Sequence, residues 1–129
     1  TLFWLTCPAL RRAVGRMEAA GWIERLAEGQ RGARAEQMSR AHATYAALRG
    51  RLALALGLWP DHAKLLRVLT MSGVGGATWR DRRALPGLKC LHAHFADFLA
   101  RGAINPVGEA VAEALSAQGE FVAGGCSLD

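Results

Sequence analysis

Hydrophobic residues recur at helical spacing along most of the chain. The first pattern consists of apolar residues separated by four and three positions: Leu10, Val14 and Met17. That spacing places them on one face of a helix. Pro8 suits the first turn, Thr6 can cap it, and Gly21 is typical of a helix end. The pattern therefore predicts a helix over residues 8–20.

Similar patterns predict four further helices, over residues 33–56, 60–71, 88–100 and 105–117. The longest of them has an expected buried face made of large side chains: Met38, Tyr45, Leu48, Leu52 and Leu56. Asn105 and Pro106 form the N-cap and first position of the last helix. Trp22 and Ile23 are interpreted as a short buried return. The apolar run 2–5 is interpreted as a buried strand or an extended entry segment.

These elements predict a mainly α fold, a small single-domain bundle of about five helices with a short extended N-terminal segment. The 129 residues, 51% apolar and 21% charged, suit one domain over residues 1–129. No apolar run reaches the roughly 18 residues of a membrane span, so we expect no membrane partner. No secretory signal is visible, which favours a cytoplasmic protein. Because the chain starts with Thr1, we expect an upstream segment.

The three cysteines are the most informative chemical feature. An odd number without a secretory signal argues against a disulfide framework, which leaves buried thiols, metal ligands or a reactive thiol. Cys7 lies at an expected helix N-terminus, where the helix dipole favours a thiolate. Cys126 follows two glycines in the C-terminal tail. No CxxC pair is present, so the zinc-finger pattern is missing.

The segment KCLHAHFADFL places further candidate ligands beside one of these cysteines. On a helix, Cys90, His94 and Asp97 share one face, while His92 points away from Cys90. A thiolate and an imidazole one turn apart suit zinc, and Asp97 can orient His94 from behind. The alternative is a buried cysteine with a surface histidine.

The net charge of +5 is carried mainly by arginine. Arg11, Arg12 and Arg16 lie off the apolar stripe of the first helix and could contact a polyanion; the alternative is a solvated basic surface. The segment LRRAVGRMEAAGWIER resembles the recognition helix of winged-helix regulators. The absence of a preceding helix and of a wing hairpin argues against DNA binding. The GVGG stretch at 73–76 lacks the P-loop lysine and is interpreted as a loop.

Two longer stretches carry a family resemblance: TLFWLTCPALRRAVGRMEAAGWI and PGLKCLHAHFADFLARGAINPVGEAV. Together they resemble the bacterial domain-of-unknown-function family 501, whose pattern is matched at residues 1–8, 89–92 and 105–108. The resemblance implies that Cys7, Cys90 and His92 belong to the defining pattern, and it leaves the choice between His92 and His94 open. Similar members usually carry an upstream segment with a Cys-Pro pair and a glycine, which this chain lacks.

The family has no assigned activity, so three functional hypotheses remain. The first is a cysteine-ligated zinc or iron–sulfur centre held by Cys7, Cys90 and Cys126, with a histidine or an upstream cysteine as fourth ligand. His92 and His94 are the candidate histidines. The second is a basic helical module that binds nucleic acid or protein. The third is a thiol-dependent enzyme with Cys7 as nucleophile.

Overall fold

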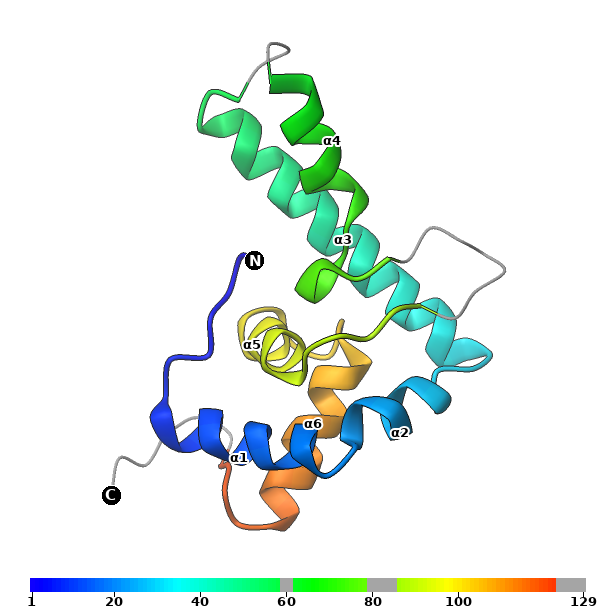
Figure 1. Ribbon diagram of the computed structural model, residues 1–129, viewed down its shortest axis with the longest axis vertical. Coiled ribbons are helices and arrows are strands. Elements are labelled where there is room, and N and C mark those ends of the chain that lie inside the picture. The colour runs from blue at the N-terminus through cyan, green and yellow to red at the C-terminus, as the bar shows by residue number, and fades with distance from the viewer. Residues whose placement is uncertain (59–61, 79–85, 123–129) are drawn as a thin grey trace.

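The computed structural model describes residues 1–58, 62–78 and 86–122, and over these it is mainly helical (Figure 1). Its elements are α1 (Pro8–Ala19), α2 (Trp22–Glu28), α3 (Ala33–Ala55), α4 (Ala63–Met71), the short 3₁₀ turn η2 (Val74–Gly76), α5 (Leu91–Arg101) and α6 (Pro106–Ala117). The predicted mainly α class is confirmed. The described residues contain six α-helices rather than five, and residues 1–7 precede α1 without regular secondary structure.

The core lies where α5 packs against α6 and α1, with the first half of α3 beside α6. The predicted stripe of α1 is buried there, together with residues of the other three helices: Leu10, Val14, Met17, Met38, Leu91, Phe95, Val107, Val111 and Leu115. These apolar side chains lose most of their contact with water, which is the main favourable term in folding. They fix α1 and α5 side by side, and the candidate site lies between those two helices.

The first helix begins and ends almost where its sequence signals place it. Cys7 rather than Thr6 is the N-cap residue, and its side chain makes no capping hydrogen bond. Pro8 takes the first helical position, where no backbone N–H is needed. Gly21 follows with a φ of 78°, a left-handed conformation that glycine adopts without steric cost.

The segment after Gly21 is a helix, so the prediction of a short buried return at Trp22 and Ile23 is wrong. In α2 the side chains of Trp22, Ile23 and Leu26 are half-buried against the core. Their spacing of one and four positions is the helical period. None of the α2 residues is fully buried, so the expected burial of Trp22 and Ile23 is only partial.

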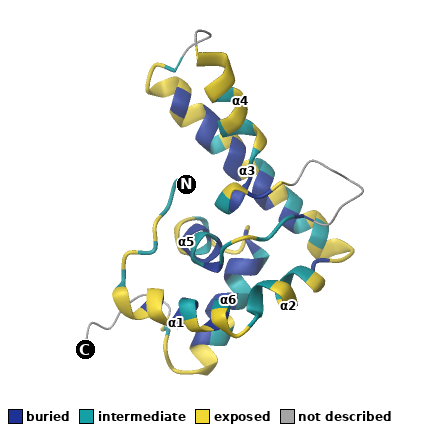
Figure 2. Ribbon diagram, in the orientation of Figure 1, coloured by how far each residue is buried: buried dark blue, intermediate teal, exposed yellow. Residues whose placement is uncertain are grey.

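The second half of α3 projects from the core and is covered on one side by the returning α4 (Figures 1 and 2). The expected buried face is wrong here, because Leu52 is 45% exposed and Leu56 is 83% exposed. The buried residues of α3 beyond Tyr45 are all small except for one arginine: Ala46, Arg49, Gly50 and Ala53. A Cβ at Gly50 would lie 2.9 Å from Thr70 Cγ2, so α4 crosses α3 at this glycine and leaves the leucines on the flanks.

The ends of α5 and α6 are joined by a close contact. The Asn105 side chain caps α6 by accepting a hydrogen bond from the Gly108 backbone N at 3.0 Å, as its sequence position predicts. A Cβ at Gly108 would overlap the His94 carbonyl oxygen and Phe98 Cβ. The two helices therefore touch through a position that has no room for a side chain. Among the described residues, no helix has the length and apolar character that a membrane crossing requires.

Candidate metal centre

A cleft of about 1030 Å³ opens between the N-terminal segment, the glycine turn η2 and the start of α5. One wall consists of residues 1 and 3–6, and the opposite wall includes Gly75, Cys90 and His92. The hydroxyl of Tyr45 holds the N-terminal wall, because it accepts a hydrogen bond from the Leu2 backbone N at 2.6 Å. The cleft is thus formed by segments far apart in the sequence.

Helix α5 begins at this cleft, three residues later than predicted. Cys90 is its N-cap residue, with an extended φ of −151°, and His92 lies in the first turn. Because Cys90 is outside the helix, the helical spacing that would align it with His94 does not apply. The expectation of a shared Cys90–His94–Asp97 face is therefore wrong, and the structure brings Cys90 together with His92 instead.

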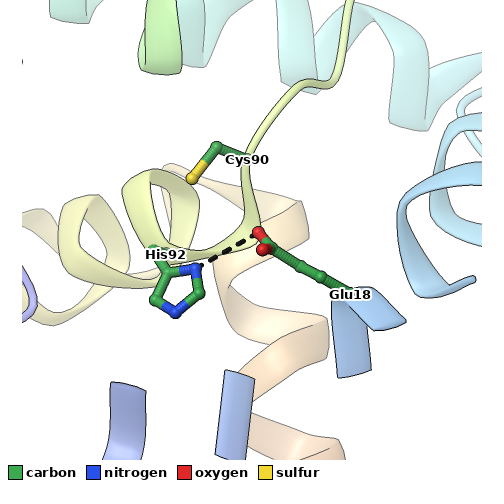
Figure 3. A group of neighbouring side chains, drawn as sticks. All are labelled: Glu18, Cys90 and His92. Atoms are coloured by element: carbon green, nitrogen blue, oxygen red, sulfur yellow. Dashed lines mark ion pairs between the residues drawn. The ribbon is translucent and has the colours of Figure 1, made fainter. Parts of the chain in front are cut away.

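Glu18, Cys90 and His92 form one group of potential metal ligands (Figure 3). One ligand atom from each residue lies within 4.8 Å of the other two, and all three residues are half-buried. Glu18 comes from the last part of α1 and reaches across to α5. Its Oε1 accepts a hydrogen bond from the Leu91 backbone N at 2.7 Å. This N–H belongs to the first turn of α5, where the helix dipole favours a carboxylate.

The contacts of the His92 ring indicate the tautomer of its neutral form. Its Nε2 lies 3.0 Å from the Arg11 carbonyl oxygen, which can only accept, so Nε2 carries the hydrogen. Its Nδ1 lies 3.2 Å from Glu18 Oε1. In the neutral ring Nδ1 is also an acceptor, and two acceptors at this distance need a cation between them. That cation is either a proton on Nδ1 or a metal ion.

His94 lies on a different side of α5 and is fully buried. Its Nδ1 is 3.1 Å from the Asn105 side chain, and its Nε2 has no hydrogen-bond partner among the described residues. Asn105 in turn donates to Asp97, whose carboxylate pairs with Arg101. Burial, and to a smaller extent the neighbouring His42 ring, lower the pKa of His94 to about 4. His94 therefore belongs to a buried polar network apart from the Glu18 group.

His42 anchors the glycine turn that forms part of the cleft. Its Nδ1 accepts a hydrogen bond from the Val74 backbone N at 3.0 Å, and its Nε2 donates to the Gly87 carbonyl oxygen at 3.1 Å. Burial is the main reason that the pKa of His42 falls to about 4. Both ring nitrogens are thus used to hold two loop segments beside α5.

The remaining predicted site residues lie elsewhere. Cys7 is disulfide-bonded in the structure, so its sulfur is not a free thiolate in this state, and Cys126 lies outside the described residues. Arg11, Arg12 and Arg16 are exposed on α1, which agrees with their predicted place off the apolar stripe. Arg16 pairs with Glu120, and Arg11 lines the cleft. A polyanion contact through these arginines stays a prediction.

Glu18 is the site residue that the sequence did not reveal. It belongs to α1, and the Leu91 N–H that holds it is 73 residues away along the chain. A lone glutamate in an amphipathic helix gives no signal of its own. The packing of α1 on α5 brings it to Cys90 and His92, and no motif spans that distance in sequence.

The fold and the cleft define a small, mainly helical protein with a half-buried Glu–Cys–His group, of which Cys90 and His92 line the cleft. The chain belongs to the family described as "Protein of unknown function (DUF501)", whose family model matches residues 1–113. The family resemblance expected from the cysteine and Asn-Pro segments is thereby confirmed. No curated protein and no solved structure matches the chain.

Proposed function

We propose that this protein binds a divalent transition metal, preferentially zinc, through Glu18, Cys90 and His92. The observation that carries the proposal is the approach of His92 Nδ1 to Glu18 Oε1 at 3.2 Å, while Nε2 is engaged by the Arg11 carbonyl. A carbonyl on the distal nitrogen is the usual arrangement behind a metal-bound histidine. The Cys90 sulfur completes a donor set of thiolate, imidazole and carboxylate, all of which zinc accepts.

The spacing of the three donors supports this assignment. Zinc bonds of about 2.0–2.3 Å place tetrahedral ligand atoms roughly 3.3–3.8 Å apart. Glu18 Oε1 and His92 Nδ1, 3.2 Å apart, are already near that separation. The other ligand-atom distances are at most 4.8 Å, so these atoms would need to approach one another by up to about 1 Å. Rotation of half-buried side chains supplies such a shift. The mixed donor set also favours zinc over an iron–sulfur cluster, which prefers thiolates.

Three protein ligands leave a fourth position for water or substrate, the pattern of catalytic rather than structural zinc sites. Cys90 and His92 line the cleft, so that position faces it. A metal bound there polarises an oxygen of the molecule that occupies the open position. The chain's own groups keep the ligands in place: the Arg11 carbonyl holds the His92 ring, and the Leu91 N–H holds the Glu18 carboxylate.

Removing any one of the three ligands is expected to weaken zinc binding by at least about 100-fold, since each supplies a direct bond. The variants are Glu18→Gln, Cys90→Ser and His92→Asn. Zinc affinity is measured by competition with a chromogenic chelator, and metal content by elemental analysis. The matched controls Glu113→Gln and His62→Asn change exposed residues of the same types, and they should bind zinc like the unmodified chain.

Two outcomes would contradict the proposal. The first is a chain that takes up no stoichiometric zinc at saturating concentration. The second is a Glu18→Gln variant that binds normally while Cys7→Ser loses the metal, which would favour the cysteine-only set predicted from the sequence. If anaerobically purified protein shows visible absorption from thiolate-to-iron charge transfer, the centre is an iron–sulfur cluster and not a zinc site.

A second candidate function uses the same three residues with a proton in place of the metal. Protonated His92 beside Cys90 would favour the thiolate, and Cys90 also caps α5 at its positive end. Cys90 would then be a nucleophile facing the cleft, the place that the sequence analysis gave to Cys7. Alkylation rates of Cys90 with and without zinc separate the two functions, because a metal-bound thiolate is protected and a catalytic thiolate reacts regardless of added zinc.

A further inference from the structure

The cleft is lined by two cationic side chains, Arg11 and Arg49, and by the imidazole of His92, and no aspartate or glutamate is among the described lining residues. Glu18 lies next to His92 but is not one of the lining residues. A cleft whose charged groups are all positive, and whose walls have a low dielectric constant, attracts and concentrates anions.

Arg11 is available for a ligand. Its side chain is exposed, and none of the described residues accepts a hydrogen bond from its guanidinium group. Its backbone carbonyl oxygen lies 3.0 Å from His92 Nε2, and both residues line the cleft. Guanidinium groups bind phosphate and carboxylate through paired hydrogen bonds.

Arg49 is the second cation of the cleft, and it is held in position. Its Nε donates to the Leu69 carbonyl oxygen at 2.6 Å, and its Nη2 donates to the Ser72 side-chain oxygen at 3.1 Å. No described carboxylate pairs with it, and burial lowers its pKa. A buried cation that has only neutral partners gains from an anionic ligand more than an exposed one does.

The opposite wall of the cleft is apolar. Phe3, Trp4 and Leu5 line it, and the Trp4 side chain is 79% exposed. Tryptophan is an uncommon residue to leave in water, and an exposed aromatic beside a cleft is typical of a ligand contact. The cleft thus offers an apolar surface facing two arginines.

We propose that the cleft binds a small organic anion, a phosphate or carboxylate on an aromatic or aliphatic body. The anionic group lies toward Arg11 and Arg49, and the body lies against Phe3, Trp4 and Leu5. The inference rests on the proposed function in one respect: if a metal is bound, its open position would face the bound anion. Anion binding itself is argued from the two arginines and the apolar wall and does not require the metal.

Calorimetric titration of the full chain with phenyl phosphate, benzoate and benzyl alcohol tests the inference. Binding of at least one of the two anions is expected, with the neutral alcohol weaker by tenfold or more, and the stronger anion identifies the headgroup. Arg11→Gln should weaken anion binding by about tenfold or more, the usual effect of losing a hydrogen bond to a charged group. Arg12→Gln, its exposed neighbour outside the cleft, should change binding less than twofold.

Titrations with and without zinc separate this inference from the proposed function. Arg11-dependent anion binding in a chain that takes up no zinc supports the anion site and overturns the metal site. Normal zinc binding without affinity for either anion overturns the anion site alone. Equal weakening by Arg11→Gln and Arg12→Gln would also overturn it, because it would mean a diffuse charge effect.

Discussion

Gly108→Ala is expected to reduce the free energy of unfolding by about 3 kcal/mol, the upper part of the usual range for overpacking a core. The added Cβ would overlap the His94 carbonyl oxygen and Phe98 Cβ, so α6 must move away from α5. One of these two obstacles is backbone, which cannot rotate aside. The measurement is urea denaturation followed by far-ultraviolet circular dichroism.

Gly15→Ala is the matched control, since Gly15 is also inside a helix. No atom outside its own helix lies within 4 Å of a Cβ at Gly15. Alanine there should raise the free energy of unfolding by up to about 1 kcal/mol, the ordinary difference in helix propensity. A Gly108→Ala variant as stable as the unmodified chain would show that α5 and α6 are not packed as closely as described.

Acidification from pH 7 to pH 5 is expected to lower the free energy of unfolding by about 2 kcal/mol through His42 alone. The pKa of His42 is about 4 in the folded chain, against 6.5 when unfolded. As the pH falls through 6.5, the unfolded chain therefore takes up a proton that the folded chain cannot. The stability contributed by the neutral ring is complete above about pH 7 and is lost progressively down to pH 4. His94 adds a loss of the same sign.

The measurement is the unfolding free energy between pH 7 and pH 4, together with the histidine ring resonances of the folded chain by NMR. The ring of His42 should remain neutral down to about pH 4. Titration of the His42 ring near pH 6.5 in the folded protein would contradict the prediction.

The bounds of α1, α3 and α6 were well predicted from the sequence, whereas α2 was missed and the buried face of the projecting half of α3 was predicted wrongly. In α1 and α6 the apolar spacing, Pro8, Gly21 and Asn105 all indicate the same boundaries. In the second half of α3 the leucines mark a face that the fold leaves exposed. There the approach of α4 at Gly50 decides the packing, and only the partner helix defines that contact.

The candidate site also contains residues that could be predicted from the sequence and one that could not. Cys90 and His92 could be named from the KCLH segment because they are neighbours in sequence. Their pairing depended on the start of α5, since a helix that included Cys90 would have paired it with His94. Glu18 could not be named at all, because its place in the group comes from the packing of α1 against α5.

The two walls of the cleft are attached to the rest of the fold with unequal strength. One wall is the start of a core helix, and it moves only if much of the core opens. The other wall is a segment without regular secondary structure. Its first residues are joined to α3 through the Tyr45 hydroxyl and the edge contact of Phe3 with the same ring, while Leu5 and Cys7 pack against the core. Such segments detach at a small fraction of the global unfolding energy. We therefore expect entry and residence time of a molecule in the cleft to depend more on release of residues 1–4 from Tyr45 than on a rearrangement of the helices.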